Sequence, residues 1–412
     1  MPNVVMLSPG FPLEMAYFTR ALAEVGATVI GVGDQPVHVL PIEARAALAH
    51  YEHVSLADES AVLLALQGLS RHVRIDQVEC LWEPYMVLAA RIRETLGLPG
   101  MTVDQTLPFR DKELMKQVLD AAGIRTPRHA STSHIAGVYA AAEEIGYPLI
   151  IKPIAGAGSA DTYRVDSPAE LETVLPMIGH VETVSVEEFI EAEEFTYDTI
   201  CGGGNILYEN VSWYRPRPLQ ARSHEWISPQ TIALRDLGRP ELAGGIAMGH
   251  QVIAALGFTA GFTHMEWYRK ADGEVVFGEI GARPPGARTV DVMNYACDAD
   301  LFRLWAAAVI TGRAEPVSRP YNAVSIFKRA RGSGYITRID GLDRLLADHR
   351  DSVCVLDLLP IGAHRRDWRA TLISDGMIIV RDPDLDRLVT MADRFGSELQ
   401  LYAEERQTDE AP

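Results

Sequence analysis

Residues 261–286 read GFTHMEWYRKADGEVVFGEIGARPPG, and they predict a β-hairpin that carries two carboxylates. Glu266 and Glu279 each stand in a strand-like run, and residues 270–273 between the runs have the composition of a tight turn. Adjacent antiparallel strands bring such side chains to one face of a sheet. The pair indicates a magnesium site, because magnesium takes one or two carboxylates and fills its other positions with water and nucleotide phosphates.

Two arginines follow the second carboxylate almost at once. Arg283 and Arg288 lie in a loop rich in proline and glycine, which can aim guanidinium groups at anionic oxygens. The alternative interpretation of the glutamates is an acidic sheet face in an acidic protein. Glu279 argues against it, because an unpaired carboxylate among apolar residues is costly to bury.

A second candidate site lies upstream, where Lys152 ends a buried strand. A loop with Gly156, Gly158 and Ser159 follows it, and glycines let backbone N–H groups approach an oxyanion while the lysine adds a positive charge. A Gly-Ala-Gly-Ser stretch alone is more often a plain turn. The P-loop signature GxxxxGK[ST] is absent, so the commonest class of nucleotide triphosphatase is excluded.

A third element is the segment VSVEEFIEAEEFTYD, residues 184–198. In an extended conformation, the backbone of Glu187 and Ile190 can offer hydrogen-bonding groups to a flat heterocycle, and Glu194 can take a ribose diol. Taken by itself, such a segment is most often a solvated run of charges.

Composition limits the class of protein. The chain has 412 residues, is 47% hydrophobic and 23% charged, and carries 38 Lys plus Arg against 56 Asp plus Glu, for a formal net charge of -18. A length of this kind predicts about two to four folding units, and the negative charge disfavours nucleic acid as a partner. The cysteines form no CxxC pair, so no zinc knuckle or disulfide framework is indicated; they are Cys80, Cys201, Cys297 and Cys354. With no basic leader and no long apolar run, a cytoplasmic location without a membrane partner is expected.

The first hundred residues predict a small doubly wound α/β domain. Apolar runs at 3–8 and 27–32 flank a helical pattern, and a third run, 78–82, precedes a helix over 84–96. No GxGxxG follows the first run, so a dinucleotide fingerprint is absent where it would have to sit. Strands then alternate with helices to about residue 315, and short β-rich pieces with a final helix predict an α+β unit beyond it. The expected division is 1–105, 106–315 and 316–412.

The pieces from about Asp111 to Gly286 together resemble the ATP-grasp superfamily, and residues 1–105 resemble its preceding Rossmann-like domain. The resemblance implies an ATP-grasp fold with a lid over about 125–190, followed by a C-terminal α+β subdomain. It implies that Lys112 and Lys152 hold ATP phosphates beneath the glycine-rich loop. The other implied roles are the adenine and ribose hinge at Glu187, Ile190 and Glu194, the ligands of magnesium or manganese at Glu266 and Glu279, and a phosphate-stabilising arginine at Arg283.

The resemblance implies ATP-driven activation of a carboxylate. The carboxylate attacks the γ-phosphorus, ADP leaves, and an amine captures the acyl phosphate, with Arg283, Arg288 and Lys152 as catalytic candidates. The form EIGARPPG and the chain length most resemble the amino-acid ligase branch, and homodimers are known among such enzymes. Many members carry asparagine two residues after the second glutamate, whereas this chain has Gly281, so the coordination of a second metal ion stays open.

Two places are candidates for substrate binding. The stretch WYRPRPLQARSHE contains Arg215, Arg217 and His224 and is unusually basic for this chain. A surface loop whose arginines pair with neighbouring acids is an equally good interpretation. Glu83, at the carboxyl edge of the N-terminal sheet, can bind a substrate ammonium or can cap its own helix, and the cap is slightly favoured.

Alternative functions remain open from sequence. An ATP-grasp enzyme could form a simple acyl phosphate such as formyl phosphate, or could carboxylate with bicarbonate. A non-catalytic nucleotide-binding module is supported only by Gly281. A nicotinamide oxidoreductase is disfavoured by the missing glycine fingerprint.

Overall fold

The computed structural model describes residues 1–154, 162–371 and 373–405. Within them the N-terminal domain is built on a parallel sheet of order β3-β2-β1-β4, as expected for a doubly wound unit. Its strands are β1 (Asn3–Leu7), β2 (Thr28–Gly33), β3 (Leu48–His53) and β4 (Gln77–Glu79). Its helices are α1 (Met15–Glu24), α2 (Ile42–Ala47), α3 (Glu59–Ser70), α4 (Met86–Leu96) and α5 (Val103–Thr106).

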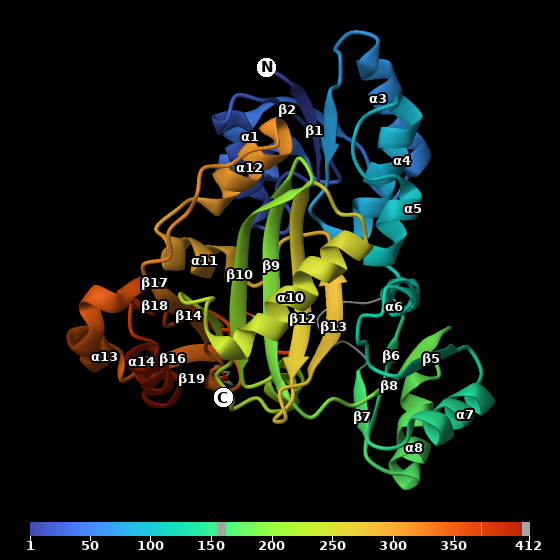
Figure 1. The fold of residues 1–412 in the computed structure, drawn as a ribbon. Coiled ribbons are helices and arrows are strands. Elements are labelled where there is room, and N and C mark those ends of the chain that lie inside the picture. The colour runs from blue at the N-terminus through green and yellow to red at the C-terminus, as the bar shows by residue number, and fades with distance from the viewer. Residues whose placement is uncertain (155–161, 372, 406–412) are drawn as a thin grey trace, which may run out of the picture.

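A small antiparallel sheet of order β5-β8-β6-β7 follows the N-terminal domain in sequence. Its strands are β5 (His129–Thr132), β6 (Leu149–Pro153), β7 (Tyr163–Val165) and β8 (Val184–Glu188). Helices α7 (Ile135–Ile145) and α8 (Pro168–Val174) cover one side of it, and α6 (Lys112–Ala121) lies between it and the N-terminal domain (Figure 1). This sheet lies within the region expected to form the lid.

The centre of the molecule is a sheet of order β13-β12-β9-β10-β11-β14-β18-β17. The strands from the middle of the chain are β9 (Glu193–Gly202), β10 (Asn205–Arg215), β11 (Gln230–Ala233), β12 (Gly261–Arg269) and β13 (Val275–Gly281). Helix α10 (Pro240–Ala255) crosses one face of the sheet (Figure 1), where Gly245 and Gly249 allow it to approach closely. A Cβ atom at these positions would lie 2.3 Å from Trp267 and 2.2 Å from Tyr197.

The C-terminal segment continues the central sheet rather than starting a detached one. Strands β14 (Asn322–Phe327), β18 (Gly376–Asp382) and β17 (Val353–Leu358) extend it beyond β11. A smaller sheet stands beside it, formed by β15 (Arg331–Gly332), β16 (Tyr335–Asp340) and β19 (Gln400–Glu404). The helices here are α13 (Leu342–His349) and α14 (Leu385–Glu398). The expected α+β content of this segment is thus present.

Residues just before the C-terminal segment join the domains. Helix α12 (Leu301–Thr311) lies beside α1 of the N-terminal domain (Figure 1), and α11 (Thr289–Cys297) packs against β11 and β14 of the central sheet. Helix α9 (Pro218–Ser223) follows β10. On α1, Phe18 meets the rings of Phe302 and Trp305 edge to face at 4.8 and 5.1 Å. This contact belongs to a buried cluster that also includes residues of β1 and of the central sheet. The burial of this apolar surface holds the N-terminal domain on the central sheet.

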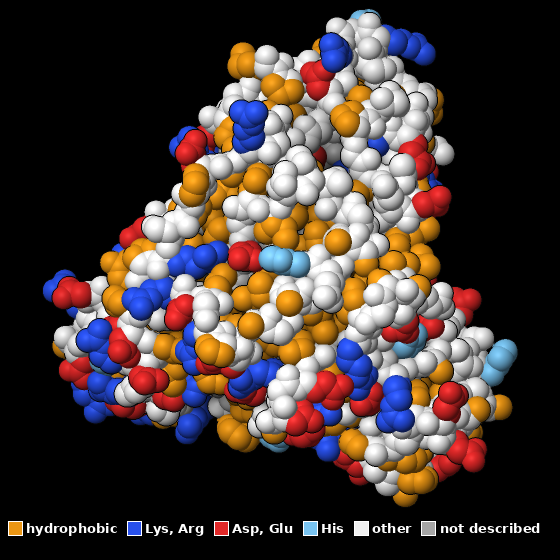
Figure 2. Space-filling view, in the orientation of Figure 1, with side chains coloured by type: hydrophobic (Ala, Val, Ile, Leu, Met, Phe, Trp, Pro, Cys, Tyr) orange, Lys and Arg blue, Asp and Glu red, His pale blue; other side chains and the backbone are white. Residues whose placement is uncertain are grey.

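Two further observations concern the charged surface and the helices. On the face shown in Figure 2, basic and acidic side chains are interspersed and form no single-sign basic patch. None of the helices in the described part of the chain combines the length and the apolar character that a membrane crossing requires.

Candidate active site

The structure confirms the predicted hairpin and places its two carboxylates opposite each other. Glu266 on β12 and Glu279 on β13 are register partners, while Trp267 pairs with Phe277, so Gly278 is an extra residue in a β-bulge. A Cβ atom at Gly278 would lie 2.8 Å from the carbonyl oxygen of Glu266, which only glycine avoids. Partners in an antiparallel pair project from the same face, so the bulge brings both carboxylates to one side.

Cationic side chains surround this pair. Lys112 is the first residue of α6, whose N-terminus is capped by the Asp111 carboxylate, and its Nζ lies 2.6 Å from Oε1 of Glu279. Burial alone would raise the pKa of Glu266, but neighbouring His264, Arg283 and Lys112 hold that pKa below its usual range. The Glu266 carboxylate is therefore ionised and available as an oxygen ligand at neutral pH.

The second lysine approaches from the small sheet. The Nζ of Lys152, on β6, lies 2.9 Å from Oε2 of Glu187 on β8. Burial opposes the charge on Lys152, but Glu187, Glu279 and Glu266 raise its pKa, which shows that the lysine also lies within electrostatic reach of the carboxylate pair. The structure thus brings Lys112, Lys152 and both glutamates around one site.

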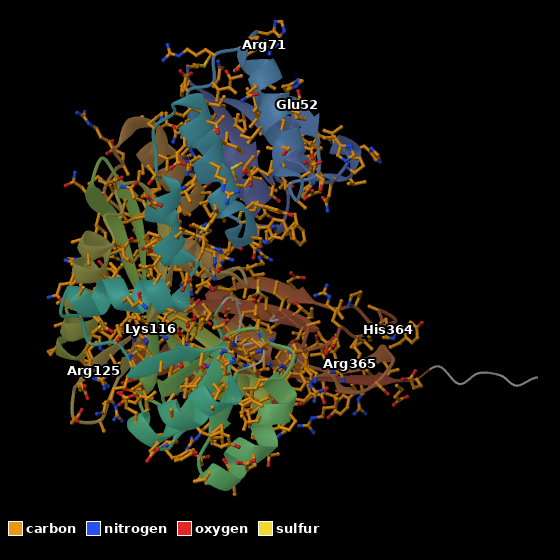
Figure 3. All side chains as sticks on the ribbon, turned by 90° about the vertical axis from the view of Figure 1, so that its right-hand side faces the viewer. Glu52, Arg71, Lys116, Arg125, His364 and Arg365 are labelled. Carbon is orange, nitrogen blue, oxygen red and sulfur yellow. The ribbon has the colours of Figure 1, made fainter. Side chains whose placement is uncertain are left out.

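A buried ion pair stands behind Lys152. Lys116, only 1% exposed, donates a hydrogen bond to Oε1 of Glu187, and the Ser185 hydroxyl donates another at 2.8 Å. Burial alone would raise the pKa of Glu187, but Lys152 and Lys116 hold it well below its usual range. Figure 3 shows Lys116 on α6, below the N-terminal domain and above the small sheet in this view. Sequence reasoning missed this residue, although it lies one turn after Lys112.

The expected hinge is occupied by an arginine from the basic stretch. Nη1 of Arg217 donates to the carbonyl oxygen of Ile190 at 2.7 Å, and its Nε lies 3.2 Å from Oε2 of Glu194. The guanidinium also lies over the ring of Tyr268, 5.1 Å from its centroid. Burial, together with Glu266, raises the pKa of Glu194 to about 8. Arg217 therefore lies against the groups that were assigned to adenine and ribose.

Glu83 reaches the same region from the N-terminal domain. Its Oε2 accepts a hydrogen bond from Nε of Arg283 at 2.7 Å, and its Oε1 pairs with Arg110. Burial opposes ionisation, but Arg283, Arg110 and Lys112 lower the pKa of Glu83. The slightly favoured cap interpretation is wrong, because Glu83 is the first residue of its helical turn rather than the cap, and its carboxylate pairs with the two arginines.

Three predicted residues lie apart from the carboxylate pair. Arg288 pairs with Asp291 at 2.8 Å and with Asp357 at 3.3 Å. Arg215 pairs with Asp393 at 3.2 Å, as the surface-loop interpretation expects, and His224 is exposed beside the Ser223 hydroxyl. The predicted loop residues Gly156, Gly158 and Ser159 lie outside the described residues.

The residues present fit a divalent cation that is shared with a nucleotide. Across the described ranges, no group of three or more His, Cys, Asp or Glu side chains could hold a metal ion by itself. Two carboxylates with cations beside them suit magnesium, which takes its remaining ligands from water and phosphate. Gly281 brings no oxygen ligand, and a Cβ there would lie 3.2 Å from Cγ of Arg283, so this position leaves room for the arginine.

Several known proteins are similar to this chain. A family model of the ATP-grasp N-terminal domain matches residues 20–100, and one of the ATP-grasp domain matches residues 109–211. The L-arginine-specific L-amino acid ligase of Bacillus subtilis is 26% identical over 246 residues, which are 57% of this chain and 59% of that protein. The chain thus spans less than two thirds of that relative's length.

A second relative and two solved structures extend the comparison. The D-alanine–D-alanine ligase of Pseudomonas fluorescens is 31% identical over 268 residues, 58% of this chain and 79% of that protein. The L-amino acid ligase from Bacillus licheniformis has a TM-score of 0.77 at 21% identity, over 98% of this chain and 99% of that one. N5-carboxyaminoimidazole ribonucleotide synthetase from Thermotoga maritima has a TM-score of 0.71 at 18% identity, over 98% of this chain and 100% of that one. The chain belongs to the ATP-grasp family, and its relatives include members of the carboxylate-amine ligase branch.

Proposed function

We propose that the protein joins an amino acid to an amine through an acyl phosphate, with release of ADP and phosphate. The family supports an ATP-dependent, ADP-forming ligation. The observation that carries the finer proposal is the gathering of Lys112 and Lys152 beside the facing carboxylates of Glu266 and Glu279. This arrangement suits a triphosphate and its cation.

The reaction consists of two displacements. An oxygen of the substrate carboxylate attacks the γ-phosphorus, the bond to the bridging oxygen breaks, and ADP leaves. The amine then attacks the acyl carbon, phosphate leaves with the carbon–oxygen bond's electrons, and the amine loses a proton. Phosphorylation is needed because a free carboxylate would have to expel oxide. The steps require positioning and neutralisation of charge, and no protein nucleophile.

The residues have separate tasks in this proposal. Lys112 and Lys152 neutralise phosphate oxygens, and Arg283, held by Glu83, faces the charge that develops on the transferred group. Glu266 and Glu279 would hold magnesium or manganese, which neutralises phosphate charge when it is bound. Arg217, Ile190 and Glu194 form the proposed nucleotide hinge. Arg288 and His224 stay candidates for contacts with the substrates, whereas Arg215 is paired with Asp393 and is assigned no contact.

A screen for phosphate release tests the proposal. Pools of amino acids and other organic acids are incubated with ATP and magnesium, first with hydroxylamine and then with candidate amines. A hydroxamate formed from one acid identifies the donor, and release stimulated by one amine identifies the acceptor. No phosphate release with any acid would contradict the proposal.

The same assay distinguishes this ligation from a second candidate function, carboxylation with bicarbonate. The likeness in fold to the Thermotoga maritima synthetase keeps it open. Phosphate release that depends on bicarbonate, and not on an amino acid, would favour carboxylation. A non-catalytic nucleotide-binding module would release no ADP in wild type or in Glu279→Gln, whereas the ligase loses its turnover in the variant.

A further inference from the structure

A cavity of about 200 Å3 lies in the N-terminal domain, at the carboxyl ends of its parallel strands. The strand order places β1 between β2 and β4, so the chain turns from one half of the sheet to the other at the β1–β4 boundary. Open α/β sheets bind ligands outside the strand ends at such a switch point. Its lining includes Phe11, Asp34, Gln35, Tyr51 and Trp82.

Three of these residues are aromatic and one is charged. Phe11 and Trp82, from opposite sides of the switch point, meet edge to face at 4.8 Å. The Tyr51 hydroxyl donates to the carbonyl oxygen of Gln35 at 2.6 Å, and burial, with Asp34 nearby, raises its pKa to about 12. Tyr51 therefore stays neutral at physiological pH. The negative faces of aromatic rings attract cations.

Asp34 gives the cavity its only formal charge, because its ten lining residues include no Lys, Arg or His. Its Oδ1 accepts a hydrogen bond from the backbone N–H of Leu56 at 2.6 Å, which fixes the carboxylate at the end of β2. A carboxylate beside aromatic rings favours a positively charged group over a neutral or an anionic one.

The size and the place of the cavity limit its occupant. Pockets for drug-sized ligands measure about 300–1,000 Å3, and this cavity is smaller, so it suits a single side chain. Trp82 lines it, and the next residue, Glu83, contacts Arg283 in the loop after β13. The cavity is thus adjacent in the chain to the proposed reaction site.

We infer that the cavity binds the side chain of a basic amino acid substrate, an alkyl chain ending in an ammonium or guanidinium group that contacts Asp34 and Trp82. This inference rests on the proposed function and names its substrate class. The rings of Phe11 and Tyr51 enclose the alkyl part. The carboxylate and amine of the substrate remain outside the cavity, toward Glu83 and Arg283.

Equilibrium titration of the full chain tests this inference, with and without a non-hydrolysable ATP analogue and magnesium. L-arginine is compared with L-citrulline, and L-lysine with L-2-aminoheptanoic acid, because each neutral partner matches the shape of the charged one. At least one basic amino acid should bind about tenfold more tightly than its neutral partner. Equal binding of the two partners, or no binding of either basic amino acid, would overturn the inference.

Variants assign the selectivity to the cavity. Asp34→Asn keeps an oxygen acceptor for the Leu56 N–H and should abolish the preference for the basic partner. Trp82→Leu should weaken binding of the basic amino acid about tenfold. Asp104→Asn, an exposed acid elsewhere in the N-terminal region, is the matched control and should change nothing. An unchanged preference in Asp34→Asn would overturn the assignment.

Binding is measured without turnover, so two failures can be told apart. If the wild-type protein releases phosphate from ATP but does not prefer a basic amino acid over its neutral partner, only the cavity inference is overturned. Selective binding of a basic amino acid without phosphate release from any acid overturns the proposed ligation alone.

Discussion

Glu83 and Arg283 are 200 residues apart in the chain, yet Nε of Arg283 donates to Oε2 of Glu83 at 2.7 Å. The carboxylate comes from the loop after β4 of the N-terminal domain, and the arginine follows β13 of the central sheet. Both side chains are largely buried. The N-terminal domain therefore sets the direction of the arginine that faces the proposed phosphoryl transfer.

Replacing this carboxylate tests that role. Glu83→Gln should lower kcat about tenfold to hundredfold, because the arginine loses the charge that orients it. The KM for ATP should change less than kcat. Steady-state kinetics measure both constants, and Glu143→Gln, on the exposed side of α7, is the control. A kcat equal to that of the control would remove Glu83 from the site.

Lys116 should support both folding and nucleotide binding. Lys116→Met leaves the buried Glu187 with Lys152 as its remaining lysine partner, so the free energy of unfolding should fall by about 3 kcal/mol. Lys152 is then held more firmly by Glu187, and the KM for ATP should rise. Urea unfolding and steady-state kinetics measure the two effects.

A double variant separates charge from packing at Lys116. Adding Glu187→Gln to Lys116→Met removes the uncompensated carboxylate and should recover part of the lost stability. Glu187→Gln could instead lower the free energy of unfolding by the same amount in Lys116→Met as in wild type. That result would show that the two residues are not coupled.

Alanine variants of the two arginines of the basic stretch should differ in their KM values. Arg217→Ala should raise the KM for ATP several-fold, because Arg217 contacts Ile190 and Glu194 at the proposed hinge. Arg215→Ala should leave the KM values for ATP and for the amino acid nearly unchanged, since its partner Asp393 is exposed. An effect of Arg217→Ala on the amino acid alone would instead support the substrate loop expected from sequence.

Lys328 predicts a pH dependence of stability away from the site. It is 2% exposed and donates to the carbonyl oxygen of Gly396 at 2.7 Å, while burial, with Arg331 nearby, lowers its pKa to about 7. The pKa of a lysine in the unfolded chain is about 10.4. Between these values the unfolded chain binds more protons, so this residue makes stability rise with pH.

The comparison with Lys328→Met isolates that contribution. Between about pH 7 and 10, the free energy of unfolding of wild type relative to Lys328→Met should rise by up to about 1.4 kcal/mol per pH unit. Urea unfolding at several pH values measures the difference. A difference that is flat across this range would show that Lys328 stays charged in the folded protein.

The parts of the fold that were predicted from sequence have strong local signals. The β12–β13 hairpin was found because its apolar runs flank a turn of typical composition, and helix α4 because its helical pattern ends at Gly97. Strand β3 was missed. Its sequence LAHYEH has mixed polarity, and it is an edge strand that buries little of its surface.

The candidate site was less accessible to sequence reasoning. The spacing of Lys112 and Lys116 places them on one face of a helix, so Lys116 could have been noticed. Its pairing with Glu187, and that of Arg217 with Glu194, depends on how distant strands pack, which no local pattern encodes. The cap interpretation of Glu83 failed for the same reason, because its partners Arg110 and Arg283 come from other elements.

In the proposed reaction, this site transfers the γ-phosphoryl group of ATP to a substrate carboxylate. The most direct test supplies an amino acid whose carboxylate carries heavy oxygen, with ATP, magnesium and an amine, and measures the label in the released phosphate by mass spectrometry. The account predicts one heavy oxygen in each phosphate, and a rate of labelling that falls about hundredfold in Glu279→Gln. Product formation that releases unlabelled phosphate would contradict it.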